Sequence, residues 1–469
     1  MKVLLVSTYE LGHQPFGLAS PAAWLAEAGA EGRCLDLAVE TLDEEAIRAA
    51  GLIAVYLPMH TATRLAGIVV PRIRAFNPSA HLCFYGLYAP LNEAFLRTEL
   101  GGGTVLGGEF ESGLVSLYKR LSANGSVALE PQSEPVISLI KQDFRVPWRK
   151  GLPQLSRYAY VVMDQEGRRT VGYTEASRGC KHLCRHCPVV PVYGGRFFVV
   201  PRGVVIGDIS QQVAGGAEHI TFGDPDFFNG VGHAIRLVEE LHGQFPDLTY
   251  DVTIKVEHLL KYAHHLETLA RTGCLFVTTA VESVDDWVLT ILDKGHTRDD
   301  FVRLVGLARR ANLTLSPTFI PFLPWTTPEG YLELLRLLTG LGLVDYVAPV
   351  QLAIRLLVPE GSRLLVVPEM QQHLDNFDAV ALSYRWSHPD PHMDVLHGRV
   401  HRAVEAGEAV DSSRRETFTK VWCLAHEACG LNAPDLENPD TLDAPTHVPC
   451  LSEPWYCCAE PTENQLSEI

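Results

Sequence analysis

Short apolar runs alternate with amphipathic stretches over roughly the first 125 residues. The runs KVLLV, CLDL, LIAVYLP and HLCFYG are typical of buried strands. The segment PAAWLAEAG between them predicts a helix with Ser20 as its N-cap, Pro21 just inside and an end at Gly29. Such alternation predicts a parallel, doubly wound sheet with ligands at the carboxyl ends of its strands, here STYELGHQPFG, PMHTAT and YGLYAPLNE.

A second alternating region lies between about residues 170 and 365. Its predicted strands are EHITFG, YDVTIKV, LFVTTAVES, LTLSPTFIP and DYVAPVQLAIRLL, and DFVRLVGLARRAN is a predicted helix. This pattern favours a full or partial barrel of β/α units whose site lies at the strand ends.

The predicted fold class is therefore α/β, with four parts. Residues 1–125 form a Rossmann-like doubly wound domain, and 126–169 form a linker that begins within the stretch SANGSVALEPQSEP. Residues 170–365 form the partial barrel. Residues 366–469 form an acidic, Pro-rich C-terminal region that ends in an irregular, cysteine-containing tail.

Composition narrows the range of functions. The 469-residue chain carries a formal net charge of −17, which argues against broad contact with nucleic acid or an anionic membrane. The apolar run near the N-terminus is too short for a signal peptide, and the longest apolar stretches are broken by charges. We therefore expect a cytoplasmic protein without a nucleic-acid or membrane partner. Its 11 cysteines are then more typical of metal ligands or reactive thiols than of disulfides.

The densest chemical signal is EASRGCKHLCRHCPVVPVYGG, residues 175–195, which contains Cys180, Cys184 and Cys187. A closed zinc site or an ordinary cluster site uses four ligands. Three thiolates instead hold three irons of a [4Fe–4S] cluster and leave the fourth iron open to a ligand. The alternatives are a zinc site completed by His182 or His186, and surface cysteines gathered by chance.

CxxxCxxC at the start of a β/α region resembles the radical S-adenosylmethionine (SAM) superfamily, and the resemblance extends beyond the cysteines. GAEHITFGDPDFFNG, AVESVDDWVLTILDKG, PTFIPFLPWTT and LLVPEGSRL are similar to later segments of the barrel in that superfamily. The resemblance implies that SAM binds the open iron. It implies SAM-binding roles for His186, Gly223, Asp224, Asp226, Glu282, Ser283 and Arg355, with Lys294 as a weaker neighbour. Helix capping or surface solvation is the alternative role for Asp224, Asp226 and Glu282.

The N-terminal region resembles the cobalamin-binding-type domain that precedes the barrel in many radical SAM proteins. A histidine that ligates cobalt lies in a D-x-H-x-x-G pattern, whereas GHQPFG offers His13 and Gly17 without the aspartate or the spacing. Base-off binding needs no protein ligand, so cobalamin stays an open expectation.

The tail contains adjacent cysteines, Cys457 and Cys458, in WYCCAEP, with Cys450 seven residues before the pair. Three thiols form the trigonal sulfur set that trivalent arsenic prefers, although Cu(I) or zinc also accepts it. A redox-inert tail is the alternative.

The CCAEP ending resembles the radical SAM group named for its CUAEP/CCAEP tail, which includes enzymes of arsinothricin biosynthesis. That resemblance implies transfer of the 3-amino-3-carboxypropyl group of SAM to arsenite, giving hydroxyarsinothricin. Cys457, Cys458 and Cys450 would bind the arsenic, and a flavodoxin or ferredoxin would supply the electron.

Two other functions stay open. One is an enzyme that acts on a small molecule, either by generating a 5′-deoxyadenosyl radical or as a cobalamin-dependent methyltransferase. A tRNA methylthiotransferase agrees less well with the negative net charge of the chain. The other is a non-enzymatic iron–sulfur and thiol redox protein, which would not consume SAM.

Overall fold

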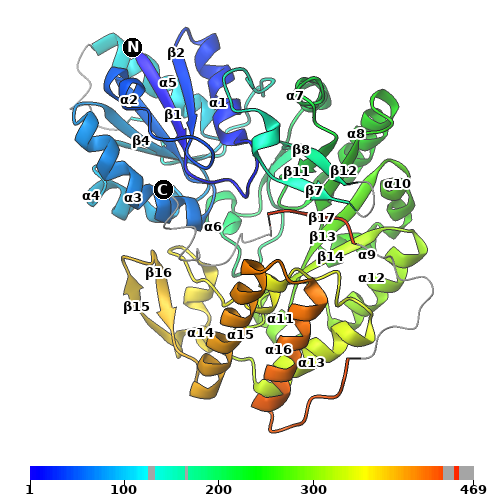
Figure 1. Ribbon diagram of the computed structural model, residues 1–469. Coiled ribbons are helices and arrows are strands. Elements are labelled where there is room, and N and C mark those ends of the chain that lie inside the picture. The colour runs from blue at the N-terminus through cyan, green and yellow to red at the C-terminus, as the bar shows by residue number, and fades with distance from the viewer. Residues whose placement is uncertain (125–132, 164–166, 437–447, 454–469) are drawn as a thin grey trace.

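The computed structural model describes residues 1–124, 133–163, 167–436 and 448–453 (Figure 1). Two large sheets organise it, a parallel sheet in the N-terminal part and a second, mostly parallel sheet in the middle of the chain. This arrangement confirms the predicted α/β class, with a Rossmann-like domain followed by a partial barrel.

The first sheet has the strand order β2-β1-β3-β4-β5-β6, and every neighbouring pair is parallel. Its strands are β1 (Lys2–Ser7), β2 (Glu31–Asp36), β3 (Leu52–Tyr56), β4 (His81–Tyr85), β5 (Thr104–Gly108) and β6 (Ile137–Ser138).

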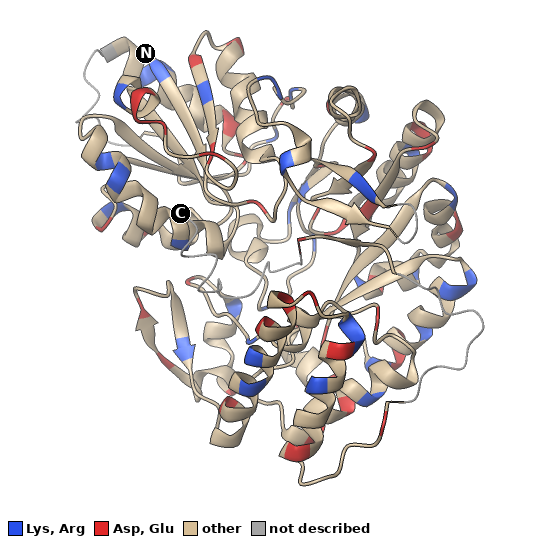
Figure 2. Ribbon diagram, in the orientation of Figure 1, with Lys and Arg blue, Asp and Glu red and all other residues tan. Residues whose placement is uncertain are grey.

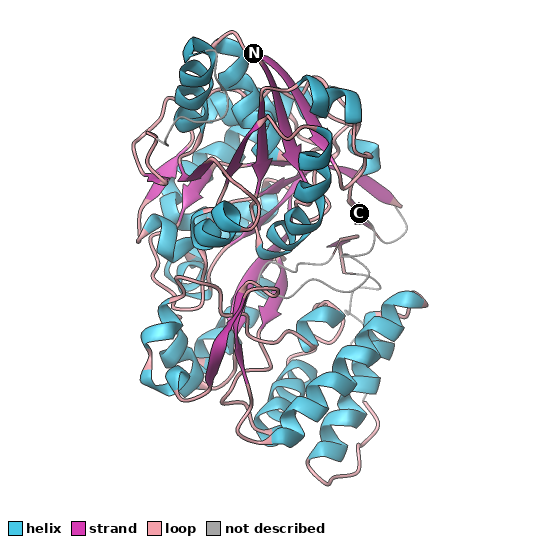
Figure 3. Cartoon of the chain, turned by 90° about the vertical axis from the view of Figure 1, so that its left-hand side faces the viewer, coloured by secondary structure: helices cyan, strands magenta, loops and turns pink. Residues whose placement is uncertain are grey.

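Helices cover both faces of this sheet, because alternate residues of each strand point to opposite sides (Figure 3). In β1, Val3 and Leu5 pack with α1 (Phe16–Glu27) and α5 (Glu111–Asn124). Leu4 and Val6 pack on the other face with α2 (Glu44–Ala49) and α3 (His60–Phe76), and α4 (Glu93–Thr98) adds Leu96 to the same core. The sheet therefore packs against a separate apolar core on each of its two faces.

The start of α1 differs from the prediction. The helix begins at Phe16, so Ser20 is not its N-cap and Pro21 lies inside it. A proline in this position cannot donate to the carbonyl four residues earlier. That carbonyl, on Gly17, accepts instead from the Tyr85 hydroxyl at 2.8 Å. A contact from a neighbouring strand thus makes the interior proline tolerable.

The second sheet has the order β14-β13-β12-β11-β8-β7-β17. Five of these strands, β8, β11, β12, β13 and β14, are parallel and form the curled half-barrel at the right of Figure 1. The strands are β7 (Tyr160–Val162), β8 (Arg168–Thr174), β11 (His219–Phe222), β12 (Thr249–Thr253), β13 (Cys274–Glu282), β14 (Thr314–Phe319) and β17 (Cys450–Leu451).

Helices follow the barrel strands and bury a common core against them. They are α7 (Arg202–Ala214), α8 (Val231–Gln244), α9 (Val256–Lys261), α10 (Leu266–Arg271), α12 (Arg298–Arg310) and α13 (Pro328–Gly340). A further helix, α11 (Asp286–Leu292), packs in a separate core with Leu323 and Ile354.

DYVAPVQLAIRLL was predicted as a strand, and the structure corrects this. The segment contains the 3₁₀ turn η5 (Pro349–Leu352), and its pairing with the preceding chain is the single bridge between Phe322 and Arg355. Proline sets the backbone angle for the start of a turn and has no N–H to donate to a sheet, so Pro349 interrupts the strand.

The predicted linker contributes to both sheets. Within 126–169, β6 extends the first sheet and β7 pairs with β8 in the second. Beyond the barrel lie α14 (Pro368–Gln371), the hairpin of β15 (Leu374–Asp378) and β16 (Ser383–Trp386), and the helices α15 (Pro391–Ala409) and α16 (Arg414–Ala428). The final described segment returns as β17 to pair antiparallel with β7.

Charged residues of both signs are interspersed over the outer helices in the view of Figure 2. Within the described part of the chain, every helix is too short or too polar to cross a lipid bilayer.

Candidate active site

The cysteine loop connects β9 (Ser177–Gly179) to α6 (Val189–Tyr193) and lies where the two domains face each other. Cys180 and Cys184 are buried, Cys187 is half-buried, and all three line one cavity. The carboxyl ends of barrel strands and of first-sheet strands line the same cavity. The structure therefore brings the three predicted cluster ligands together.

Close backbone packing shapes the start of the loop. Gly179 has φ +72°, and a Cβ there would lie 2.4 Å from the Tyr193 ring, so only glycine fits. Asn229 accepts from the backbone N–H of Lys181 at 3.2 Å and donates to the Gly179 carbonyl at 3.3 Å. These contacts fix the backbone on both sides of Cys180.

The chemistry of the thiols fits a bound cation. Burial raises the pKa of Cys180 to about 11, with the Asp226 carboxylate adding to the effect. A buried thiol of this kind ionises when a metal binds its sulfur. Lys294 is buried close to Cys184 and Cys187, where its charge balances thiolates. Three clustered thiols beside a buried ammonium therefore suit a metal–sulfur cluster.

Glu282 lies at the end of β13 in an unusual backbone conformation. Its φ is +67°, and the pairing of β13 with β14 shifts register between Ala280 and Glu282, as in a β-bulge. The carboxylate lines the cavity, where Oε1 lies 3.2 Å from both Lys294 Nζ and His186 Nε2. Burial raises the pKa of Glu282, but these two neighbours outweigh it and hold the value at about 2. Glu282 is therefore ionised in the folded protein, in a position for binding a ligand.

His186 and His182 each contact a carboxylate. His186 pairs with Glu282, and burial lowers the pKa of His186. His182 lies beside Asp226. Each imidazole therefore has a carboxylate as its partner. This differs from the alternative in which His182 or His186 completes a zinc site with the three cysteines.

The two residues after β11 have different positions: Gly223 lines the cavity, whereas Asp224 supports the backbone behind it. Gly223 lines the cavity, and a Cβ there would lie 1.9 Å from the Tyr173 hydroxyl. Asp224 accepts from the Ser177 hydroxyl at 2.5 Å and from the Ala176 N–H at 2.9 Å. Asp224 thus holds the strand that leads into the cysteine loop, and burial raises its pKa to about 7.

The remaining predicted residues lie elsewhere. Ser283 accepts from the Asp285 N–H at 3.1 Å, next to the cavity wall. Arg355 does not line the cavity, because its guanidinium pairs with Asp394 at 2.6 Å and lies 3.7 Å from the centre of the Trp386 ring. Cys450 lies in β17. Cys457 and Cys458 lie outside the described residues.

Arg178 was expected to offset the charge of the thiolates, whereas its carboxylate partners and Glu10 were not singled out from the sequence. Arg178 is buried and lies 2.7 Å from carboxylate oxygens of Glu111 and Glu175, and 3.5 Å from Glu109. The lining also contains Glu10, whose pKa is raised mainly by burial. Charged residues directly after buried strands, as in STYE and GGEFE, were the available signal.

Comparison with known proteins identifies the barrel. Residues 174–338, about a third of the chain, match the model of the radical SAM superfamily. This part of the chain is a radical SAM domain. A radical SAM domain uses a [4Fe–4S] cluster and SAM, which agrees with the cysteine loop and with the cofactors expected from the sequence.

A curated relative matches less than half of the chain. The tRNA-2-methylthio-N(6)-dimethylallyladenosine synthase of Novosphingobium aromaticivorans is 25% identical over 207 residues, or 41% of this chain. The match spans 45% of the length of that protein.

Two solved structures share both domains of the fold. The radical SAM methyltransferase TsrM from Kitasatospora setae aligns with a TM-score of 0.61 and 18% identity, covering 80% of this chain and 78% of that one. The cobalamin-dependent radical SAM enzyme OxsB aligns with a TM-score of 0.66 and 14% identity, covering 87% and 67%. The N-terminal domain therefore has the fold of a cobalamin-binding-type domain.

Whether the residues fit cobalamin is a separate question. His13 lines the cavity, but its ring stacks on Tyr173 at 4.8 Å between centroids, and burial lowers the pKa of His13 to about 4. At the carboxyl edge of the first sheet, Tyr56, Tyr85 and Phe110 pack against one another at centroid distances of 5.0 to 6.1 Å. These aromatics occupy part of the edge where a doubly wound sheet usually binds its ligand, so the residues at this edge do not fit cobalamin.

Proposed function

We propose that this protein is a radical SAM transferase that moves the 3-amino-3-carboxypropyl group of SAM to trivalent arsenic. The observation that carries the enzyme assignment is the shared cavity, in which three cysteines, Gly223 and the Glu282–Lys294 pair meet at the ends of barrel strands. In this proposal Cys180, Cys184 and Cys187 hold the [4Fe–4S] cluster. When bound, the cluster supplies an electron for cleavage of a C–S bond of SAM.

Residues of the chain orient SAM in this proposal. The ionised Glu282 suits the amino or ribose hydroxyl groups of SAM, while the buried Lys255 suits a carboxylate. Gly223 leaves room for the Tyr173 hydroxyl, so both residues can line the cavity wall. His186 is placed by Glu282 with its ring on the cavity wall, consistent with an adenine-side contact.

The arsenic substrate is supported by the tail sequence and by where the chain leads. The strand β17 ends one residue before Ser452, and Glu453 contacts the Tyr9 hydroxyl. A Cβ on Gly12 would lie 3.0 Å from Glu453 Cβ, next to the cavity-lining Leu11 and His13. The described chain therefore ends beside the cavity wall, four residues before Cys457 in the sequence.

The proposed reaction balances as follows. One electron from a reduced flavodoxin or ferredoxin breaks the bond between the sulfonium and the aminocarboxypropyl carbon, which releases methylthioadenosine. The carbon radical forms a bond to As(III); one electron then returns to the oxidised flavodoxin or ferredoxin and one As–OH proton goes to water, as arsenic reaches the pentavalent state of hydroxyarsinothricin. Soft thiols such as Cys450, Cys457 and Cys458 suit the trivalent substrate and release the harder pentavalent product.

The direct test is anaerobic incubation of cluster-loaded protein with dithionite, SAM and arsenite, followed by mass spectrometry. We expect methylthioadenosine and an amino acid with an arsenic–carbon bond. Formation of 5′-deoxyadenosine with untouched arsenite would overturn the arsenic assignment and retain the radical SAM enzyme. No consumption of SAM at all would instead favour the iron–sulfur redox protein.

The cysteine variants separate the two thiol groups. Alanine at Cys180, Cys184 or Cys187 should remove SAM cleavage and most of the cluster absorbance. Cys457→Ala and Cys458→Ala should retain the cluster and abortive SAM cleavage but form no arsenic product. The exposed Cys423 on α16 is the matched control, and Cys423→Ala should leave product formation unchanged. Product formation by Cys457→Ala and Cys458→Ala would contradict the role of the tail.

A second candidate is a radical SAM methyltransferase that acts on a small molecule, favoured by the two-domain fold shared with TsrM and OxsB. Binding of cobalamin by the purified protein, seen in its visible spectrum, together with methylated product would support this alternative.

A further inference from the structure

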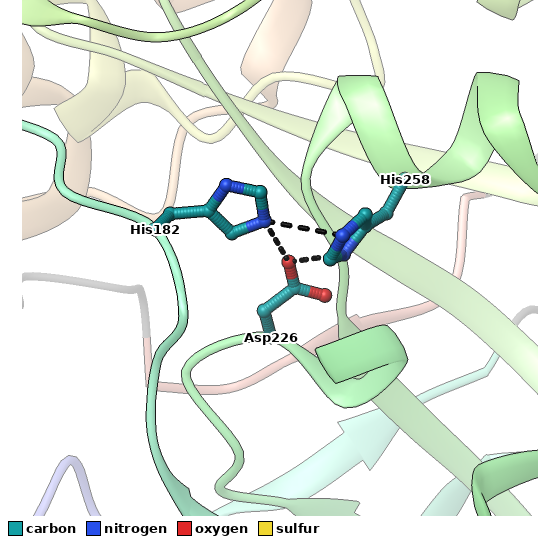
Figure 4. Close-up of side chains that lie close together, drawn as sticks. All are labelled: His182, Asp226 and His258. Carbon is teal, nitrogen blue, oxygen red and sulfur yellow. Dashed lines mark hydrogen bonds and ion pairs between the residues drawn. The ribbon is translucent and has the colours of Figure 1, made fainter. Parts of the chain in front are cut away.

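Two histidines and an aspartate converge beside the cysteine loop (Figure 4). His182 belongs to the loop itself, between Cys180 and Cys184. Asp226 follows β11 and caps the 3₁₀ turn η3 (Phe227–Gly230), and His258 lies on α9 after β12. Three separate elements therefore bring their side chains to one point.

The spacing of the donor atoms matches a metal site. His182 Nε2 lies 3.2 Å from His258 Nε2 and 3.4 Å from Asp226 Oδ2. Two ligand atoms of a tetrahedral zinc ion, each about 2.05 Å from the metal, are roughly 3.3 Å apart. The imidazole of His258 also approaches Asp226 Oδ2 through Nδ1, at 2.7 Å.

Burial makes this arrangement costly without an ion. The side chains of Asp226 and His258 are 0% and 2% exposed, and that of His182 is 13% exposed. The contact between Asp226 Oδ2 and His258 Nδ1 lacks the alignment of a hydrogen bond, so both buried atoms have no directed hydrogen-bond partner among the described residues. Buried polar atoms in this state normally have an unseen partner, such as an ion.

The charges around the cluster agree with a cation. Asp226 Oδ2 is the carboxylate oxygen that both imidazoles approach, at 3.4 Å from His182 and 2.7 Å from His258. Glu257 Oε2 lies 3.6 Å from Nδ1 of His182, where a second carboxylate can orient the ring, as is usual behind a metal-bound histidine.

We propose that His182, Asp226 and His258 bind a single divalent transition-metal ion of the zinc type, separate from the cysteine cluster. Two imidazoles and a carboxylate leave at least one coordination position free. Of the three ligands, His182 lines the cavity, so the free position lies on that side. With one carboxylate the ion keeps a net positive charge, which favours water or an anionic oxygen donor there. The ion also ties the cysteine loop to the ends of β11 and β12.

Zinc itself is the probe. Cluster-loaded protein is incubated anaerobically with Zn²⁺, passed over a chelating resin and analysed for zinc, iron and sulfide. We expect one tightly held zinc per chain in addition to the iron of the cluster. X-ray absorption at the zinc edge should show nitrogen and oxygen ligands at about 2.0–2.1 Å, with imidazole scattering and no sulfur at about 2.3 Å.

Two substitutions test the ligands. His258→Gln and the isosteric Asp226→Asn, which retains the oxygen that caps η3, should each lower the zinc affinity at least about tenfold. His264→Gln is the matched control, since His264 is exposed a short distance along the chain, and it should keep zinc. Wild-type protein stripped of zinc by the resin, sulfur ligands at the zinc edge, or equal zinc loss in the control would each overturn the proposal. None of these readouts requires turnover, so they are independent of the proposed reaction.

Discussion

At the scale of single residues, buried carboxylates dominate the interface between the domains. Glu175 pairs with Arg178 at 2.7 Å, yet burial is the largest influence and raises the pKa of Glu175 to about 7. The folded protein therefore holds a proton at Glu175 that the unfolded chain releases near its ordinary pKa of about 4.5. Because the folded state binds more protons between these values, stability should fall as pH rises from 4.5 to 7.

This yields a prediction for Glu175→Gln, which is neutral at every pH. The wild type should lose on the order of 2–3 kcal/mol of stability through Glu175 as pH rises across this window, and the variant should lack that loss. The midpoint of thermal unfolding at pH 5 and at pH 8 measures it for both proteins. Parallel pH profiles of the two proteins would contradict the assignment.

At the scale of elements, close approaches between helices and strand ends set the packing. Gly17 in α1 lies against the ring of Tyr56 at the end of β3, and a Cβ on Gly17 would lie 2.1 Å from that ring. Helix α1 can therefore approach the sheet this closely only with glycine. The same short distance lets Tyr85 reach the Gly17 carbonyl that Pro21 leaves without a donor.

We expect Gly17→Ala to destabilise the protein by about 1–3 kcal/mol through overpacking. Tyr56→Leu in the same chain should restore part of the loss, because it removes the ring that the new methyl group meets. Gly32→Ala on β2 is the control, since a Cβ there has no neighbour within 4 Å. Denaturant unfolding of the wild type, Gly17→Ala, Tyr56→Leu, the double variant and Gly32→Ala measures the coupling, and equal costs for Gly17→Ala with and without Tyr56 would refute the contact.

At the scale of the whole molecule, Arg178 joins the two domains. It leaves β9 of the radical SAM domain and reaches Glu109 and Glu111 at the end of β5 and the start of α5. Its guanidinium is 6% exposed, so the charges are paired away from water. Removal of one partner of a buried ion pair leaves the others uncompensated, which is far more costly than the loss of an exposed pair.

Arg178→Met should therefore lower the free energy of unfolding by about 3–5 kcal/mol and separate the thermal transitions of the two domains. Arg202→Met is the control, because its pair with Glu240 is about 40% exposed and should cost less than about 1 kcal/mol. Differential scanning calorimetry distinguishes the two. A single, unshifted transition in Arg178→Met would show that the domains are coupled by other contacts.

Periodicity and the spacing of three cysteines determined much of this protein. The alternation of buried runs with helices predicted both sheets, because burial of a parallel strand on two faces demands a continuous apolar run. The interval between Cys180, Cys184 and Cys187 predicted a shared thiol site, since a short loop keeps its ligands together whatever the rest of the chain does. The superfamily and Glu282 came from the resemblance of several segments, and the structure places Glu282 in the same cavity.

Contacts between distant segments were decided only by the tertiary structure. The sequence carries no sign that Pro21 is tolerated inside α1, because its compensation comes from Tyr85 on another strand. Arg355 was predicted to bind SAM, but its contacts with Asp394 and Trp386 hold its guanidinium away from the cavity. His182, Asp226 and His258 likewise converge only because three strand–helix units pack side by side. Residues that meet in this way are not separated by a regular interval in the sequence, so no sequence pattern indicates the contact.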